Sequence, residues 1–143
     1  MEVVVDANVW LSAANSREPG HASSVRFIRE AMAQRVVFLL PVLVLPEVAG
    51  TAARCTQDAA DGLALMEQLL RLPNARFLEL TVTRAKSAAL LASSLFLKGA
   101  DAQYAALAAE HHVALVTLDR ELRERSGKQY SGLTPEDWVA RFA

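Results

Sequence analysis

The chain has a single cysteine, Cys55, among 143 residues, so it can form neither an intrachain disulfide nor a cysteine-rich zinc site. Aromatic residues are also scarce, at 6%, whereas 52% of the residues are hydrophobic. Ala, Val and Leu must therefore build most of the core. The longest apolar stretch, residues 36–45, contains Pro41 and is too short to cross a bilayer. There is no glycine-rich phosphate-binding loop, so nothing supports an NTPase.

The chain also carries almost no net charge. The formal net charge is -1 and the pI is about 6.3, which excludes a strongly cationic nucleic-acid-binding domain. Any contact with phosphate groups must be local or carried by metal ions. The first residues, MEVVVDANVW, lack the basic region of a signal peptide. Together with the lone thiol, this predicts a cytoplasmic protein with no membrane association.

Short apolar runs alternate with longer amphipathic segments along the chain. The length suits a single domain spanning residues 1–143. Runs that are apolar at successive positions are typical of strands buried on both faces of a parallel sheet, and four are found: Glu2–Val5, Val36–Leu40, Arg76–Leu80 and Val113–Thr117. Helical spacing or composition predicts helices at His21–Arg35, Asp58–Leu72, Arg84–Leu97, Ala102–His111 and, from a cap at Thr134, through Phe142. This alternation predicts an α/β fold, a three-layer α/β/α sandwich around a parallel sheet.

Four acidic residues are placed where they can meet at one edge of that sheet. In open parallel sheets, ligands bind beyond the carboxyl ends of the strands. Asp6 directly follows the first strand, and Asp119 follows the fourth with one residue between. Glu47 lies in a helical stretch after the second strand, and Asp101 lies near the start of a helix after Gly99. We therefore expect the four side chains to converge.

Four carboxylates in one small site require a cation or protons. At ~4 Å and an effective dielectric constant near 20, each like-charged pair costs about 4 kcal/mol. An all-oxygen set of ligands favours Mg²⁺ or Mn²⁺ over zinc. A carboxylate-bound Mg²⁺ suits in-line hydrolysis of a phosphodiester. The three histidines, His21, His111 and His112, are interpreted as capping or surface residues.

Each acidic residue also has an ordinary structural interpretation. Asp6 and Asp119 could serve as turn or cap residues at strand ends, and Asp101 could simply begin a helix. Asn8 could cap the next helix, or it could hydrogen-bond a metal-bound carboxylate. Glu47 is the exception, because its apolar surroundings, PVLVLPEVAG, favour a partner or a site over a solvated acid.

Four motifs taken in order resemble the PIN-domain nucleases, especially VapC-like toxins of toxin–antitoxin pairs. They are VVVDANVW, LPEV, GADAQYAALA and LVTLDREL, and together they extend over nearly the whole chain. The resemblance assigns the four catalytic, metal-binding acids of the family to Asp6, Glu47, Asp101 and Asp119. It assigns two supporting polar positions to Asn8 and Thr117. Pro46, directly before Glu47, departs from the pattern and predicts that the helix begins or bends there.

The resemblance implies a PIN-type fold, dependence on Mg²⁺ or Mn²⁺, and RNA as the substrate. It also implies a small antitoxin protein as partner and a homodimer of the toxin. Candidate phosphate contacts are Arg17, Lys98, Arg120 and Arg123, each of which could instead be a solvated charge, and Trp10 could stack on a base or cover the core. The function predicted is therefore that of a metal-dependent endoribonuclease, the toxin of a type II system.

Two alternatives remain open from the sequence. A Mg²⁺-dependent phosphatase of the haloacid-dehalogenase type also begins with an aspartate after its first strand. Such an enzyme carries a second aspartate two residues later, where this chain has Asn8. The other alternative is a PIN-like binding module without activity, although all four acids are present.

Overall fold

The computed structural model describes residues 1–143 and contains one five-stranded sheet. Its strands are β1 (Glu2–Val5), β2 (Val37–Pro41), β3 (Ala75–Leu78), β4 (Ala114–Val116) and β5 (Ser131–Leu133). All neighbouring strands are parallel, in the order β3-β2-β1-β4-β5. The carboxyl ends of all five strands therefore lie at the same edge of the sheet.

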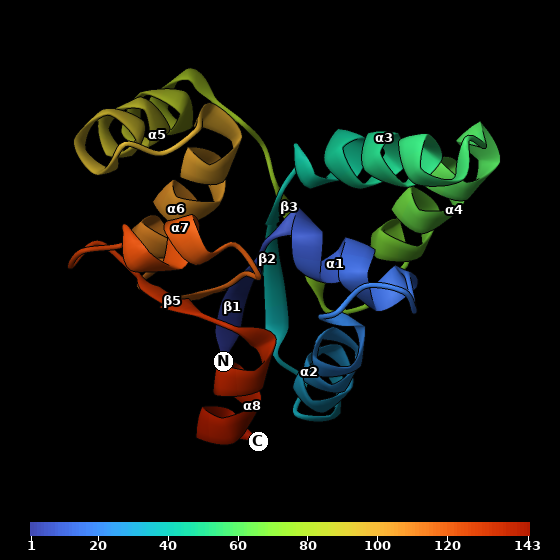
Figure 1. Cartoon of the computed structure of the whole chain (residues 1–143). Coiled ribbons are helices and arrows are strands. Elements are labelled where there is room, and N and C mark those ends of the chain that lie inside the picture. Colours follow the sequence, from blue (N-terminus) through green and yellow to red (C-terminus); the bar gives the residue numbers. More distant parts are fainter.

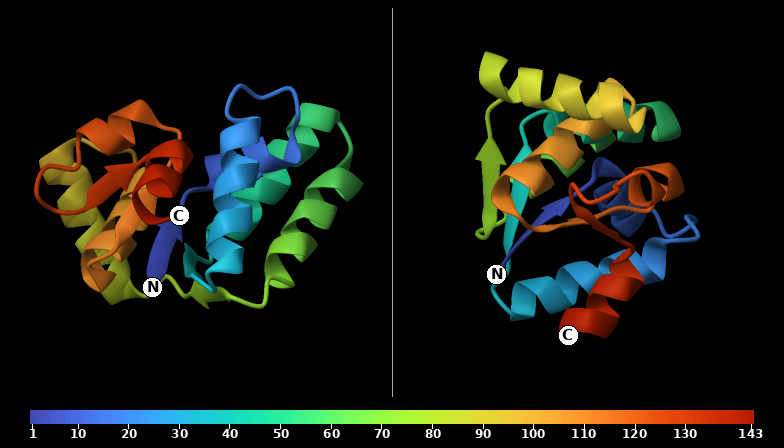
Figure 2. Two further views of the ribbon diagram at one scale, coloured as in Figure 1. Left: turned by 90° about the horizontal axis from the view of Figure 1, so that it is seen from below. Right: turned by 90° about the vertical axis from the view of Figure 1, so that its left-hand side faces the viewer.

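Eight helices flank this sheet. They are α1 (Ala7–Ala14), α2 (His21–Ala33), α3 (Val44–Thr56), α4 (Ala59–Leu70), α5 (Val82–Leu95), α6 (Gly99–His111), α7 (Arg120–Glu124) and α8 (Pro135–Phe142). Figure 1 shows α1 to α4 on one side of the sheet and α5, α6 and α7 on the other. Figure 2 shows α8 lying beside α2, against which it packs. The predicted α/β/α sandwich is thus confirmed. None of the helices has the length and apolar character that spanning a membrane would require.

The central strands are buried because helices cover both of their faces. Every residue of β1 except the first is fully buried, as are the middle residues of β2 and the last two of β4. Four of the nine aromatic residues form one cluster that includes Phe38 of β2. There, ring pairs in edge-to-face geometry join Trp10 to Phe38 and Phe27 to both Phe38 and Trp138. The scarcity of aromatic residues is therefore offset by their concentration in one cluster.

The predicted strands and helices are present, with ends displaced by a few residues. The short helix α7 follows Asp119 directly and ends at Glu124. Strand β5 was not predicted, because Ser131-Gly132-Leu133 has no apolar run. A Cβ atom at Gly132 would lie 2.8 Å from the Cα of Arg123, so glycine allows this strand to pass close to α7.

Pro46 does not interrupt its helix. Helix α3 begins at Val44, two residues earlier than the sequence suggested, so the proline occupies the first turn. Backbone N–H groups in the first turn have no partner within the helix, so a proline there removes no hydrogen bond. The Glu47 N–H donates to the carbonyl of Leu43 at 3.2 Å, which places Glu47 firmly within the helix.

Two glycines inside helices should respond oppositely to the same substitution. A Cβ at Gly62 of α4 would collide with the carbonyl oxygen of Ala49 in α3, whereas one at Gly50 of α3 would meet only the end of the Arg54 side chain, at 3.8 Å. We expect Gly62→Ala to destabilise the protein by about 1–3 kcal/mol through overpacking. Gly50→Ala should stabilise it by about 0.5–1 kcal/mol through helix propensity. Urea unfolding of both variants measures this, and equal effects would show that α3 and α4 are not in close contact.

Candidate active site

The site is built where the two central strands end. Strands β1 and β4 are neighbours, and Val5 is paired with Val116. The ladder extends one residue further, because the N–H of Asp6 donates to the carbonyl of Val116 at 3.0 Å. Asp6 and Thr117 therefore leave the sheet side by side, although 111 residues separate them in sequence.

The hydroxyl group of Thr117 is the centre of a buried hydrogen-bond network. It donates to Oδ2 of Asp6 at 2.7 Å and accepts from Nδ2 of Asn8 at 3.2 Å and from the N–H of Asp119 at 3.0 Å. Oδ1 of Asn8 in turn accepts from the N–H of Leu118 at 3.2 Å. A hydroxyl has one donor and two acceptor positions, so Thr117 is fully satisfied. Asn8 lies inside α1, so it does not cap that helix, and its amide bonds to Thr117 and Leu118 rather than directly to a carboxylate as predicted.

Asp6 occupies a capping position without capping the helix. It stands at the N-cap of α1, yet its side chain makes no capping hydrogen bond and is turned toward Thr117. Only 5% of the residue is exposed. Burial raises the pKa of Asp6 from 3.8 to about 7; the hydrogen bond from Thr117 opposes this shift, and the charges of Asp101 and Glu47 reinforce it. A buried carboxylate of this kind lowers stability unless a cation accompanies it.

Glu47 lies in the first turn of α3 and is held by a tyrosine. The hydroxyl of Tyr104 donates to Oε1 of Glu47 at 2.8 Å. Burial raises the pKa of Glu47, the bond from Tyr104 lowers it, and the charge of Asp101 raises it further. The negative end of this side chain therefore faces the cluster rather than a cationic partner.

Asp101 is the acid that links the others. It lies in the first turn of α6, and its charge raises the pKa values of both Asp6 and Glu47. The pKa of Asp101 itself is raised by burial and then by the charge of Asp119, while Lys98 acts in the opposite direction. The four predicted acids therefore lie in one connected electrostatic cluster, with Asp101 between the other three.

Asp119 also has an ordinary structural role as a helix cap. It is the N-cap of α7, and its Oδ1 accepts from the N–H of Leu122 at 3.1 Å. The turn interpretation from the sequence is therefore correct for this residue. It does not remove Asp119 from the cluster, because a carboxylate has acceptor capacity beyond one hydrogen bond.

The donor set fits a hydrated divalent ion rather than a closed metal cage. No three His, Cys, Asp or Glu side chains are arranged closely enough to hold a metal ion among them. Mg²⁺ is commonly bound through one or two carboxylates and retains several water molecules. The buried carboxylate of Asp6 and the half-buried carboxylates of Glu47 and Asp101 repel one another and match that chemistry, and no histidine contributes. His21 instead contacts the carbonyl of Ser12 at 2.9 Å, and His111 lies 3.8 Å from Glu2.

The candidate phosphate contacts differ in position. Lys98 is exposed and lies close enough to Asp101 to lower its pKa, so it borders the cluster. Arg120 is exposed and paired with Glu124 at 2.7 Å. Arg123 donates to the carbonyl of Thr117 at 3.1 Å, so it supports the strand end instead of facing solvent. Arg17 lies apart, in a groove described below.

The stacking role suggested for Trp10 is wrong, since this ring is buried against Phe38.

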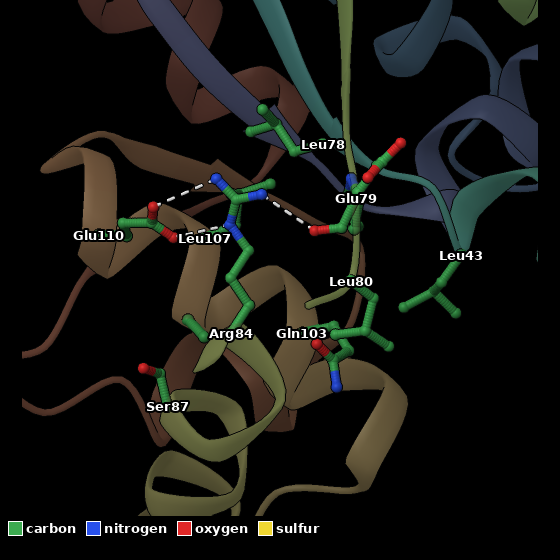
Figure 3. Close-up of a pocket in the computed structure, with 11 residues that line it drawn as sticks. Leu43, Leu78, Glu79, Leu80, Arg84, Ser87, Gln103, Leu107 and Glu110 are labelled. Atoms are coloured by element: carbon green, nitrogen blue, oxygen red, sulfur yellow. Dashed lines mark hydrogen bonds and ion pairs between the residues drawn. The ribbon is translucent and has the colours of Figure 1, made fainter. Parts of the chain in front are cut away.

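Two hollows lie outside the acidic cluster. Figure 3 shows one beside α5 and α6, where Arg84 is paired with Glu110 at 3.3 Å and donates to the carbonyl of Glu79 at 2.9 Å. With about 20 Å³ it has room for roughly one water molecule. The other is a groove of about 770 Å³ between α1, α3 and α4. Its walls combine apolar residues such as Leu11 and Leu65 with charged Arg17, Glu18 and Asp61.

Sequence reasoning missed Tyr104 and Glu121 and misjudged Arg123. Glu121 lies near enough to Asp101 to raise its pKa. Tyr104 could have been recognised, because it follows Asp101 by three residues and so shares its helix face, in a helix otherwise rich in alanine. For Arg123 no signal in the sequence separates a bond to a strand-end carbonyl from a solvated charge.

Comparisons with known proteins agree with this geometry. A family model for the PIN domain matches residues 3–128. VapBC2 of Rickettsia felis bound to a promoter DNA fragment is similar at 13% identity and a TM-score of 0.71, over 94% of this chain and 98% of that one. VapC20 of Mycobacterium tuberculosis, a toxin that cleaves the sarcin–ricin loop, has 17% identity and a TM-score of 0.70, over 87% and 95%. VapBC-1 of nontypeable Haemophilus influenzae has 15% identity and a TM-score of 0.69, over 94% and 98%. No curated protein matches significantly by sequence.

The raised pKa of Asp6 predicts how metal-free stability depends on pH. The native state keeps this proton up to a pH of about 7, whereas the unfolded chain loses it near the pKa of 3.8. Between these values the native state binds more protons, so this residue makes stability fall as the pH rises. We expect Asp6→Asn, measured in chelator, to match the wild type near pH 4 and to be more stable at pH 8 by a few kcal/mol (order of magnitude).

The matched control is Asp58→Asn. Asp58 is the N-cap of α4, and asparagine caps equally well, so Asp58→Asn should change the free energy of unfolding little at pH 8. Urea unfolding at several pH values gives both results. A loss of stability in Asp6→Asn at pH 8 would contradict the assignment of Asp6 as a costly buried charge.

Proposed function

The chain belongs to the PIN domain family, and on that premise we propose that it is a metal-dependent ribonuclease. The observation that carries the proposal is the buried, uncapped Asp6 held beside Glu47 and Asp101. Three acids in such surroundings are costly to the fold, and a divalent cation offsets that cost. Perturbed carboxyl groups of this kind cluster at functional sites.

Each acid is given a role. Asp6 and Asp101 would hold the cation directly, and Asp119, whose charge acts on Asp101, would contact it through a bound water, since no three such side chains lie close enough to bind one ion together. A bound Mg²⁺ or Mn²⁺ supplies charge neutralisation at the phosphate and lowers the pKa of a bound water. Glu47 is a further ligand or accepts a hydrogen bond from the attacking water and so orients it. Thr117 holds Asp6 through its bond of 2.7 Å, and Asn8 in turn holds the hydroxyl of Thr117 at 3.2 Å.

RNA is the proposed substrate. The similar VapC20 cleaves the sarcin–ricin loop, which supports a phosphodiester in RNA as the target of the same fold. Lys98 beside Asp101 is the basic residue best placed to contact a phosphate at the cluster. Arg120 can join it if its pairing with Glu124 is given up, an exposed pairing that contributes little to stability.

Neither alternative function is supported by a specific observation. The match to the PIN domain over residues 3–128 argues against a phosphatase of the haloacid-dehalogenase type. A binding module without activity would have no need to retain a buried acid such as Asp6 at a cost in stability. Cleavage assays separate this module from the enzyme.

Cleavage should depend on both the acids and the metal. Asp6→Asn and Asp101→Asn remove charge at nearly constant volume, so we expect each to lower RNA cleavage at least about 100-fold while the fold is retained. Chelator should abolish cleavage by the wild type, and millimolar Mg²⁺ or Mn²⁺ should restore it. The same ions should raise the melting temperature of the wild type, since they bind only the native state.

Asp58→Asn is again the control, because it removes an exposed acid at a distance from the cluster. It should cleave at the wild-type rate and respond to metal in the same way. Wild-type cleavage by Asp101→Asn would show that the central residue is wrongly assigned. A melting temperature that metal does not change, together with an absence of cleavage, would contradict the proposed function itself.

We also propose a small antitoxin protein as partner. Several similar structures are toxin–antitoxin complexes, among them one from Klebsiella pneumoniae with 18% identity and a TM-score of 0.60, over 93% of this chain and 97% of that one. The groove between α1, α3 and α4 is the surface we assign to it, because it is lined by the second halves of α1 and α3, whose first turns lie at the acidic cluster. A helix in this groove can place an arginine against the carboxylates.

A charged residue placed in this groove should prevent binding of the partner protein and leave catalysis intact. Ala64 lies exposed in α4 on the groove wall, and Ala33 lies exposed at the end of α2 outside it. Co-expressed with the product of the adjacent small gene, the wild type should form a stable complex with suppressed cleavage. Ala64→Arg should lose the complex and remain an active nuclease, whereas Ala33→Arg should behave as the wild type. Size exclusion and an RNase assay measure this, and an intact complex with Ala64→Arg would exclude the groove.

The homodimer implied by the resemblance stays a prediction. Exposed apolar residues around α5, including Val82, Leu90 and Phe96, are each more than 70% exposed and are available for such a contact. The same size-exclusion measurement on the free protein reports its oligomeric state.

A further inference from the structure

Tyr104 is a fully buried residue whose polar end reaches the acidic cluster. Its relative exposure is 0%, and its hydroxyl donates to Oε1 of Glu47 at 2.8 Å. Glu47 forms no ion pair and accepts no other hydrogen bond from the protein. One side chain, 57 positions away in the chain, therefore sets the orientation of this carboxylate.

Helix α6 is built to bring this phenol to its place. Ala102, Ala105 and Ala108 are buried, and α6 packs on β1, β2 and β4, so small residues let the helix approach the sheet closely. The bulk of Tyr104 then extends beneath the start of α3. Because Asp101 precedes Tyr104 by three residues, one rigid helix presents both an acid of the cluster and the donor that holds a second acid.

The hydroxyl is a permanent donor in these surroundings. Burial raises the pKa of Tyr104, and the charges of Glu47 and Asp6 raise it further, so the group stays neutral at any physiological pH. A buried hydroxyl without a partner would cost free energy, and Phe would fill the same space without that need. The pairing with a carboxylate of the site is therefore the feature that distinguishes tyrosine from phenylalanine here.

Building on the proposed function, we propose that Tyr104 is a positioning residue that occupies Oε1 of Glu47 and leaves Oε2 free for a divalent cation or its bound water. The hydroxyl restricts the glutamate to one conformation, and it transmits the position of α6, and hence of Asp101, to α3. Loss of such a supporting hydrogen bond to a metal-binding group is expected to weaken metal affinity or activity about 10-fold or more.

The first test needs no metal and does not depend on the proposed function. The carboxyl carbon of Glu47 is observed by NMR in protein labelled with ¹³C-glutamate, in chelator. Tyr104→Phe should shift and broaden this resonance. The control is Tyr130→Phe, which removes another buried tyrosine hydroxyl, one that donates to the carbonyl of Leu122 at 2.6 Å. It should leave Glu47 unchanged. An unchanged Glu47 resonance in Tyr104→Phe overturns the proposal.

The second test is a double-mutant cycle on Mn²⁺ affinity. The affinity is measured from the rise in melting temperature that Mn²⁺ causes. Tyr104→Phe alone should weaken Mn²⁺ binding about 10-fold. In a Glu47→Gln background it should add little, because its effect passes through Glu47. Additive losses overturn the positioning role. If the wild type itself does not respond to Mn²⁺, the proposed function fails, while the NMR result still decides whether Tyr104 positions Glu47.

Discussion

The site depends on one hydrogen bond, from the hydroxyl of Thr117 to Asp6, which joins the ends of the two central strands. The two acceptor positions of this hydroxyl are taken by the amide of Asn8 and the N–H of Asp119, so its only proton must be donated to Asp6. The hydroxyl oxygen of Thr117 thereby joins the ends of both strands to the start of α1 and the start of α7. A small shift of either strand would break several bonds at once, so the parallel pairing of β1 with β4 and the geometry of the acids are a single constraint.

The same arrangement builds the proposed site at a cost in stability. A buried Asp6 that neither caps its helix nor meets a cationic side chain lowers the free energy of unfolding at neutral pH. Much of the remaining structure is ordinary and favourable, such as the capping box at Thr134 and Asp137 and the aromatic cluster beside β2. The local cost is thus confined to the carboxyl edge of the sheet, where strain of this kind indicates a functional site.

The sequence predicted this edge because the rule for open parallel sheets uses only strand ends, and Asp6 and Asp119 stand directly at them. It also predicted the α/β/α layers and the cap of α8. It missed β5, since pairing with β4 is a tertiary contact that Ser131-Gly132-Leu133 does not encode locally. It expected α3 to begin or bend at Pro46 because proline is a strong local signal, while the backbone bonds that begin the helix at Val44 are not visible in the residue pattern. The bond between Tyr104 and Glu47 depends on how α6 and α3 are packed, which no spacing in the chain reveals.

The charge balance of the chain constrains how such a site can meet RNA. With a net charge of -1 the protein as a whole does not attract RNA, and the acids of the cluster repel phosphate groups. Lys98 lowers this repulsion only locally, beside Asp101. A divalent cation would offset part of this negative charge at the point where cleavage is proposed, so the binding of metal and the binding of RNA would favour each other. Few phosphates can then be neutralised by side chains, and recognition must depend on the shape of the RNA around the scissile bond more than on counterion release.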